Sequence, residues 1–156
     1  MAALEAGNEA PDFTLKDQDG NDVSLSSYRG SSAVALVFYP FTFTAVCEGE
    51  LCALRDDLSR FESAGVQVLA VSCDSRFVQK KWAAEMGYGF PLLADNWPHG
   101  AVASAYGVFN EALGCANRGT FLIDAEGTIV DSIETANLGT AREAAWYEQA
   151  IVKLSA

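Results

Sequence analysis

Basic residues are scarce in this 156-residue chain, which has 10 Lys and Arg against 21 Asp and Glu and a net charge of −11. A nucleic-acid-binding protein needs a concentrated positive face, because neutralising phosphates drives its affinity. Attraction to an anionic membrane surface depends on the same kind of face. We therefore exclude nucleic acids and membranes as primary partners.

Long apolar runs are also missing, since the longest, Ala33 to Tyr39, has the length of a strand. About 20 apolar residues are needed to span a bilayer. The first residues, Met1 to Pro11, lack the basic and apolar regions of a signal peptide. We expect a cytoplasmic protein, in which thiols stay reduced. A structural disulfide framework then does not explain the four cysteines, which are Cys47, Cys52, Cys73 and Cys115.

Histidine occurs once, as His99, and no Cys-x-x-Cys pair is present. The single histidine excludes most zinc hydrolases, and it excludes Cys-His or Ser-His pairs unless His99 is the base. Since His99 follows Trp97 and Pro98 in a turn, we expect it to be structural or on the surface.

The order of the expected elements indicates an α/β protein with a central mixed β-sheet flanked by helices. Strands are expected at 33–39, 66–72 and 90–94, with hairpins around 17–21 and 125–127. Helices are expected at 43–64, 75–86 and 102–109, and a last helix follows Gly139 with a capping box from Thr140 to Glu143. We predict one domain over residues 1–156.

The 43–64 helix has an apolar stripe at helical spacing, and Cys47 lies on it in the first turn. Unpaired backbone N–H groups and the helix dipole favour an anion there, and so favour a thiolate. A free thiol is only about 3% ionised at pH 7, and a helix terminus supplies at most about 2 kcal/mol. More stabilisation is needed. The alternative is a cysteine that merely packs on the stripe.

A hydroxyl and a cation in the sequence could add the stabilisation that the thiolate still needs. Thr44, three residues before Cys47, can point its hydroxyl into the same pocket. Arg118 directly precedes the apolar strand at 120–123, and strand ends are where such sheets build sites. A solvated loop arginine is the alternative for Arg118.

At this point the residues resemble those of the peroxiredoxin family. The pattern Pro40-x-x-x-Thr44-x-x-Cys47 resembles the peroxidatic motif, and Arg118-Gly119 resembles the family's distant arginine. The segment 10–15 looks like the opening strand, and Trp82 and Phe90-Pro91-Leu92-Leu93 are similar to later landmarks. Segments 97–102, 105–110 and 117–121 make the one-cysteine, alkyl hydroperoxide reductase E type the most similar branch.

The resemblance implies a thioredoxin-like fold and reduction of hydrogen peroxide and organic hydroperoxides, with peroxynitrite as a further candidate. It also implies that the reaction needs neither a metal nor a bound organic cofactor. Cys47 would attack the peroxide and become a sulfenic acid. Thr44 and Arg118 would hold the two oxygens, and Pro40 would shield the thiolate from water. Glu50 matches an acid that orients the arginine, although an ordinary first-turn carboxylate is an equal alternative. Tyr39, Phe41 and Phe43 hint at tolerance for an apolar alkyl tail.

Cys52 departs from the one-cysteine pattern and looks like the resolving residue of some bacterioferritin comigratory proteins. Five helical residues separate Cα atoms by roughly 8.7 Å, whereas disulfides need about 4.4–6.8 Å. A bond between Cys47 and Cys52 therefore requires the first turns to unwind. The alternative is that Cys52 only packs and that an external thiol attacks Cys47.

The remaining expectations are less specific. Cys73 and Cys115 are expected to be packing thiols, with Cys115 a second resolving candidate. The family implies a homodimer and a reducing thiol partner, which could be thioredoxin, mycoredoxin or a low-molecular-weight thiol. Two other functions stay open, a thioredoxin-like thiol–disulfide oxidoreductase and a non-enzymatic acidic interaction or holdase module.

Overall fold

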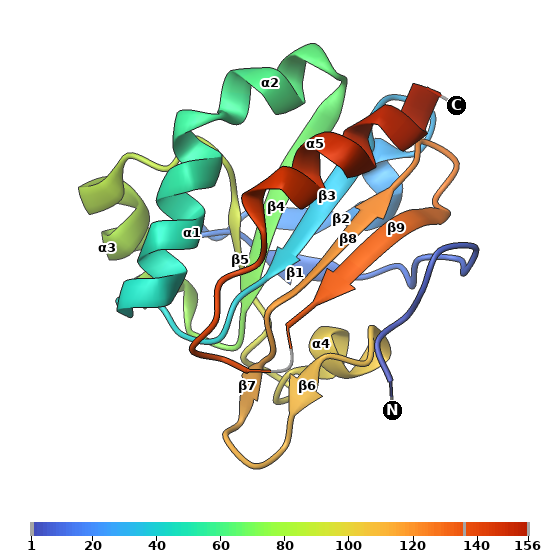
Figure 1. The fold of residues 1–156 in the computed structure, drawn as a ribbon. Coiled ribbons are helices and arrows are strands. Elements are labelled where there is room, and N and C mark those ends of the chain that lie inside the picture. The colour runs from blue at the N-terminus through green and yellow to red at the C-terminus, as the bar shows by residue number, and fades with distance from the viewer. Residues whose placement is uncertain (1, 136, 156) are drawn as a thin grey trace.

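The fold is described from a computed structural model, which covers residues 2–135 and 137–155. Its centre is a seven-stranded sheet in the order β2-β1-β5-β4-β3-β8-β9 (Figure 1). These strands are β1 (Thr14–Lys16), β2 (Asp22–Ser24), β3 (Ala33–Phe38), β4 (Val66–Ser72), β5 (Leu92–Ala94), β8 (Gly119–Ile123) and β9 (Ile129–Glu134). The helices are η1 (Leu25–Tyr28), α1 (Ala45–Asp56), α2 (Leu58–Ser63), α3 (Arg76–Met86), α4 (Ala101–Ala105), α5 (Ala144–Val152) and η2 (Lys153–Ser155).

The sheet is mixed, as the sequence predicts. Strands β3, β4 and β5 run parallel and are joined by helical crossovers, whereas β8 runs antiparallel to β3 and β9 runs antiparallel to β8. Strand β3 is buried along its whole length, which accounts for its continuous apolar sequence. Both expected hairpins, β1–β2 and β8–β9, are present.

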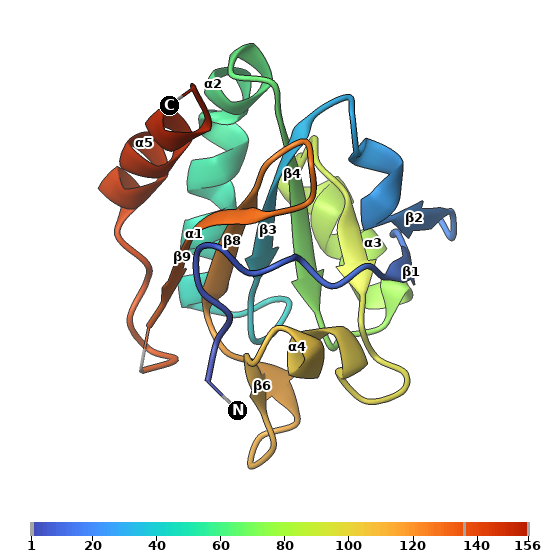
Figure 2. The same ribbon diagram turned by 90° about the vertical axis from the view of Figure 1, so that its right-hand side faces the viewer.

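Two apolar layers cover the two faces of the sheet. One packs α1, α2, α3 and α5 against the sheet, and the other packs α4 and the N-terminal segment against the opposite face. Figure 2 shows α1, α2 and α5 grouped together, with α4 and β6 at one end of the strands. No helix of residues 2–135 and 137–155 combines the length and apolar character needed to cross a membrane.

The prediction of one unbroken helix over 43–64 is wrong. Asp57 leaves helical geometry with φ −105° and ψ 10°, so the segment forms two helices, α1 and α2. Phe43 lies outside the helix with φ +66°, a conformation that bulky residues rarely adopt. Gly65 does end the segment, with φ +74°. The apolar stripe survives the break because Cys47 and Phe61 are both buried.

Helix α3 begins and ends as predicted. The hydroxyl of Ser75 accepts a hydrogen bond from the Val78 amide, and Gly87 ends the helix with φ +67°. The first-turn residue Val78 is 41% exposed. Gln79, Trp82 and Ala83 are buried instead.

The expected helix at 102–109 is also too long. Helix α4 ends at Ala105, and a short hairpin follows, made of β6 (Phe109–Asn110) and β7 (Cys115–Ala116). The turn residue Gly107 has φ +76°, and an added Cβ would lie 2.1 Å from the Ala2 carbonyl oxygen. Only glycine fits this turn, and the helix therefore stops before it.

The capping box from Thr140 to Glu143 does not form. Helix α5 begins at Ala144, and its N-cap, Glu143, makes no side-chain capping bond. The segment before it runs as a loop toward the ends of β3 and β8. Its course brings Arg142 into the interior, where the arginine is 5% exposed.

Candidate active site

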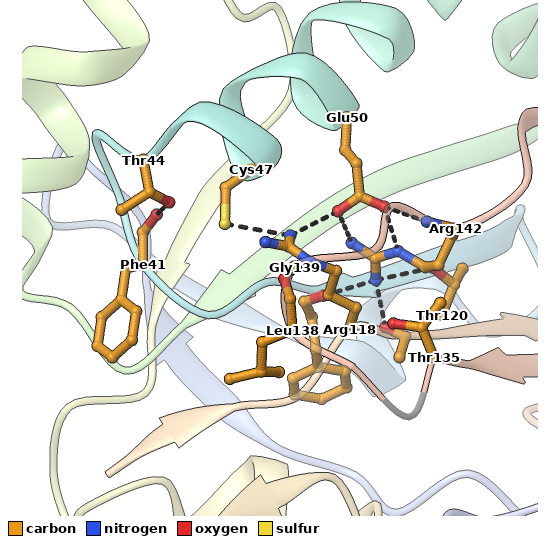
Figure 3. Close-up of polar contacts among 12 residues, drawn as sticks. Phe41, Thr44, Cys47, Glu50, Arg118, Thr120, Thr135, Leu138, Gly139 and Arg142 are labelled. Carbon is orange, nitrogen blue, oxygen red and sulfur yellow. Dashed lines mark hydrogen bonds and ion pairs between the residues drawn. The ribbon is translucent and has the colours of Figure 1, made fainter. Parts of the chain in front are cut away.

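Cys47 lies in the first turn of α1 and is fully buried. Its Sγ accepts a hydrogen bond from Nη1 of Arg118 at 3.2 Å (Figure 3). The sequence-predicted pairing of this cysteine with a distant cation is therefore present in the structure.

The sheet register brings Arg118 to the cysteine. Val37 of β3 pairs with Thr120 of β8 in antiparallel fashion. The start of β8 therefore meets the end of β3, from which the chain continues into α1. Arg118 is 3% exposed, and its Nε donates to the Leu138 carbonyl oxygen at 2.7 Å. It is not a solvated loop arginine.

Glu50 links two buried guanidinium groups, one turn after Cys47 on α1. Its Oε1 accepts from Arg118 Nη1 at 2.7 Å and from Arg142 Nη2 at 2.9 Å. Its Oε2 accepts from Nε of Arg142 at 2.9 Å and from the Arg142 backbone amide at 2.8 Å. This carboxylate is a buried anchor for the arginines, as the family resemblance implies, and not a solvated first-turn acid.

Arg142 is a site residue that the sequence argument missed. Its Nη1 donates to the carbonyl oxygens of Phe38 and Gly119 at 2.6 and 3.0 Å, and to the Thr120 hydroxyl at 3.2 Å. It thereby joins the end of β3, the start of β8 and helix α1. The Thr-x-x-Glu spacing suggested a helix start here, which would leave the arginine exposed. No local signal in the sequence contradicted that pattern.

The cluster around the sulfur of Cys47 carries an excess of positive charge. The two guanidinium groups carry two positive charges and the Glu50 carboxylate one negative charge, and the sulfur of Cys47 is the next acceptor (Figure 3). An anionic sulfur brings the four groups to neutrality. The two arginines therefore leave one positive charge without a partner beside the sulfur, and such unpaired buried charge is costly.

The carboxylate itself is held ionised. Burial alone would raise the pKa of Glu50, but the hydrogen bonds and charge of Arg142, together with the charge of Arg118, outweigh that effect and lower the pKa below its ordinary value. The negative charge of Glu50 is therefore a fixed feature of the site near neutral pH.

The structure does not bring the Thr44 hydroxyl to the sulfur. Thr44 is exposed at the N-cap of α1, and its hydroxyl donates to the Phe41 carbonyl oxygen at 2.6 Å (Figure 3). An N-cap threonine usually accepts a bond from a first-turn amide, but this one makes no such cap. Among the hydrogen bonds of the described residues, the amides of Val46 and Cys47 have no partner. They remain free to bind an anion or a substrate oxygen.

The loop between β3 and α1 supplies the other predicted residues. Pro40 is buried and offers no N–H to the site. Phe41 and Phe43 are 38% and 48% exposed, which fits their predicted place at the entrance. Tyr39 is wrongly predicted there, because it is fully buried and its hydroxyl bonds that of Thr42 at 3.0 Å.

Cys52 lies in the same helix as Cys47 but faces elsewhere. Its half-buried Sγ is 3.7 Å from the Tyr88 hydroxyl, whereas the sulfur of Cys47 contacts Arg118. All four cysteines are free thiols in this structure. Within the described residues, no group of three His, Cys, Asp or Glu side chains could hold a metal ion. His99 packs its ring edge-on against Trp97, with centroids 4.6 Å apart.

Comparisons with known proteins agree with this geometry. Residues 6–132 match the model of the AhpC/TSA family. The chain is 48% identical over 153 residues to alkyl hydroperoxide reductase E of Mycobacterium bovis, which covers 98% of this chain and 99% of the relative. It is 40% identical to the chloroplastic 2-Cys peroxiredoxin BAS1 of Spinacia oleracea, covering 87% of this chain and 54% of that protein. The crystal structure of peroxidoxin BcpB from Mycobacterium tuberculosis superposes with a TM-score of 0.86 at 30% identity, covering 97% of both chains.

Proposed function

Because the chain belongs to the AhpC/TSA family and is a thiol-dependent peroxidase of the peroxiredoxin kind, we propose that Cys47 is the sulfur that attacks the peroxide. The thioredoxin-like fold predicted from the sequence is the fold of its structural neighbours. A thiol–disulfide exchanger and a non-enzymatic module fit these relatives less well. The observation that supports Cys47 most directly is its contact with Arg118 at 3.2 Å.

The proposed reaction displaces one peroxide oxygen by the other. The thiolate of Cys47 attacks the nearer oxygen, the O–O bond breaks, and the cysteine becomes a sulfenic acid while water or an alcohol leaves. Arg118 and the free amides of Val46 and Cys47 stabilise the charge that develops along the O–O bond. Pro40 limits water at the sulfur. Thr44 joins them once its hydroxyl leaves the Phe41 carbonyl.

The substrates proposed are hydrogen peroxide and organic hydroperoxides, with peroxynitrite as a further candidate. Phe41 and Phe43 support the organic hydroperoxides, because both present exposed apolar area at the entrance.

Stopped-flow mixing with hydrogen peroxide tests the role of Cys47. The Cys47→Ser variant should consume no peroxide, because a serine hydroxyl is not ionised at neutral pH and cannot form the sulfenic acid. Cys52→Ser, which leaves Cys47 in place, should retain the first reaction. Peroxide consumption by Cys47→Ser at the wild-type rate would exclude Cys47 as the nucleophile.

We propose that Cys52 then resolves the sulfenic acid within the same chain. The two sulfurs face different neighbours, so the first turns of α1 must open before they meet. Gly49 lies between them, and glycine weakens a helix interior by about 0.5–1 kcal/mol relative to alanine. The sequence thus makes this stretch of α1 easier to unwind.

Gly49→Ala should slow formation of the Cys47–Cys52 disulfide about two- to fivefold, because it stabilises the closed helix. A Cβ at Gly49 meets nothing within 4 Å, so packing does not oppose the change. The exposed Ala45, in the same helix, offers the opposite variant, and Ala45→Gly should speed the disulfide. Quenched samples analysed by mass would time the loss of two hydrogens. Equal disulfide rates in the three proteins would show that unwinding of α1 does not control the step.

We further propose a homodimer that forms through the edge near the active-site loop. The ring centroids of Phe43 and Trp82 lie 6.1 Å apart, so the active-site loop packs against α3. The same helix has two exposed apolar side chains, Phe77 at 67% and Val78 at 41%. Large apolar side chains exposed in this way are typical of an interface. Sedimentation velocity should give twice the 16.6 kDa chain mass, and Phe77→Glu should shift it toward the monomer. A monomeric wild type contradicts the proposal.

A thiol must return the enzyme to its reduced form. Thioredoxin, mycoredoxin and a low-molecular-weight thiol are the proposed reductants, and a peroxidase assay coupled to each in turn would rank them. The cytoplasm is the proposed location, since turnover depends on a supply of reduced thiols.

A further inference from the structure

The active-site loop, residues 39–44 between β3 and α1, is bound by a carboxylate that has no part in the reaction described so far. This carboxylate belongs to Asp74, which lies two residues after the end of β4. Its Oδ2 accepts a hydrogen bond from the backbone amide of Thr42 at 2.8 Å. Since 32 residues separate the two along the chain, the bond is a tertiary contact that ties the loop to the end of β4.

Buried polar groups hold the Asp74 carboxylate in place. The Ser72 hydroxyl donates to the same Oδ2 at 2.8 Å. The Ser72 oxygen in turn accepts from Nε2 of Gln79 at 3.0 Å, and this nitrogen also donates to the Leu93 carbonyl oxygen at 2.8 Å. Ser72 and Gln79 are fully buried. The position of the carboxylate is therefore set by β4, α3 and β5 together.

The first half of the loop is fixed at more than one point. The Tyr39 amide donates to the Val71 carbonyl oxygen of β4 at 2.9 Å. The Tyr39 hydroxyl bonds that of Thr42 at 3.0 Å, and both side chains are buried. Together with the bond from Thr42 to Asp74, these contacts hold residues 39–42 against the end of β4.

The next residue, Phe43, has a backbone conformation that needs such support. Its φ of +66° is one that bulky side chains rarely adopt. A strained backbone of this kind persists only where its surroundings determine it. The bond from Thr42 to Asp74 fixes the chain just before Phe43, and the Phe43 ring packs on Trp82 with centroids 6.1 Å apart. Without the first of these contacts, Phe43 can relax and shift Thr44, which follows it.

The Thr44 backbone already has the conformation that its proposed role requires. Thr44 is the N-cap of α1, with φ −112° and ψ 148°. From this extended conformation a threonine oxygen reaches the amides of the second and third helical residues, which here are Val46 and Cys47. These amides stabilise the developing charge in the proposed reaction. The hydroxyl now donates to the Phe41 carbonyl oxygen (Figure 3), and a turn about χ1 is enough to redirect it if the backbone stays in place.

We propose that Asp74 is a positioning residue for the reaction of Cys47 with peroxide. The inference rests on the proposed function, in which Cys47 attacks the peroxide and Thr44 holds one of its oxygens. Asp74 acts through the Thr42 amide, and not on the sulfur. By fixing the chain before the strained Phe43, it keeps the Thr44 backbone where the hydroxyl can reach the substrate.

Replacing Asp74 with alanine tests the proposal by single-turnover stopped flow. Asp74→Ala should react with hydrogen peroxide about ten- to a hundredfold more slowly, since a displacement of about 1 Å can cost about a hundredfold in rate. Alkylation of Cys47 by iodoacetamide should keep its wild-type rate, because this reagent has no second oxygen to hold and Arg118 still contacts the sulfur. Equal losses in both reactions would overturn the proposal.

A conservative variant distinguishes the hydrogen bond of Asp74 from its charge. Asp74→Asn removes the negative charge but retains an oxygen that can accept from the Thr42 amide. It should recover most of the peroxide rate that Asp74→Ala loses. An asparagine variant as slow as the alanine variant would contradict the anchoring role.

Asp95 offers a matched control for loss of stability. It directly follows β5 and is 1% exposed, and its carboxylate accepts from the amides of Val102 and Ala103 at 3.1 and 2.8 Å. It is thus the same kind of anchor at a neighbouring strand, but it holds α4. Asp95→Ala should lower stability and leave the peroxide rate unchanged. If it slows the reaction as much as Asp74→Ala does, the positioning role of Asp74 is excluded.

A double variant shows whether Asp74 acts through Thr44. Thr44→Val should slow the peroxide reaction, and adding Asp74→Ala should slow it little further, because both changes remove the same hydroxyl from the substrate. Multiplying losses, or a wild-type rate in Thr44→Val, would overturn the proposal while leaving Cys47 as the nucleophile. If the wild-type protein does not react with peroxide, the proposed function itself fails, and the role of Asp74 fails with it.

Discussion

Replacing Arg118 with alanine is expected to slow the reaction of Cys47 with hydrogen peroxide by about 10²- to 10³-fold, the loss seen when one preorganised donor is removed from a catalytic site. A single nitrogen of Arg118, Nη1, bonds both the sulfur and the Glu50 carboxylate, at 3.2 and 2.7 Å. Alanine removes the donor to the sulfur and to the developing charge on the substrate. It also removes the positive charge that contacts the sulfur.

The Arg118→Lys variant distinguishes the effect of the positive charge from that of the guanidinium donor geometry. Lysine retains the positive charge but presents a single ammonium group, so it cannot hold the sulfur, Glu50 and the Leu138 carbonyl oxygen together. Its rate should lie between those of the wild type and Arg118→Ala. Single-turnover stopped flow measures all three proteins, and Arg60→Ala serves as an exposed-arginine control. A loss of less than tenfold in Arg118→Ala would refute the proposed role of the arginine.

The parts of this fold that the sequence predicts are those encoded by local pattern. The apolar run of β3, the hairpins around 17–21 and 125–127, and the Ser75 and Gly87 ends of α3 all follow from neighbouring residues. The pairing of Cys47 with Arg118, which 71 residues separate along the chain, was predicted from the place of Arg118 at a strand end and from the family resemblance.

The errors arose where distant contacts decide the local structure. The local sequence around Arg142 predicts a helix start, but the arginine instead bonds the Glu50 carboxylate and the carbonyl oxygens of Phe38 and Gly119 in the interior. The sequence predicts that the Thr44 hydroxyl points into the pocket of Cys47, yet this hydroxyl donates to the Phe41 carbonyl oxygen of its own loop. Neither preference is visible without the three-dimensional partners.

Arg142→Met is expected to lower the free energy of unfolding by about 3–5 kcal/mol, which is the cost of leaving a buried charge without its partner. The Arg142 side chain is fully buried, and its loss strips two bonds from the Glu50 side chain and leaves the Phe38 carbonyl oxygen without this donor. Urea unfolding of the reduced protein measures the change. The matched control is Arg60→Met, whose exposed pairing with Glu148 should be worth no more than about 1 kcal/mol.

A double variant identifies the source of the loss. Glu50→Gln with Arg142→Met removes both members of the pair, so the cost of an unpaired carboxylate disappears. The two substitutions together should therefore cost less than the sum of the two singles. Additive losses would show that Arg142 acts through packing and its carbonyl contacts, and not through Glu50.

The pH dependence of stability tests the interaction of Arg142 with Glu50 independently. In the wild type the pKa of Glu50 is lowered, so its contribution to stability is complete above the ordinary value of 4.5 and is lost as the pH falls through the folded-state pKa. Without Arg142, burial dominates and the pKa of Glu50 rises. The acid-unfolding midpoint of Arg142→Met should then move to higher pH, whereas that of Arg60→Met should stay within the wild-type range. An unchanged acid midpoint in Arg142→Met would mean that Arg118 alone keeps Glu50 ionised, and the charge balance at Cys47 would then depend on a single cation.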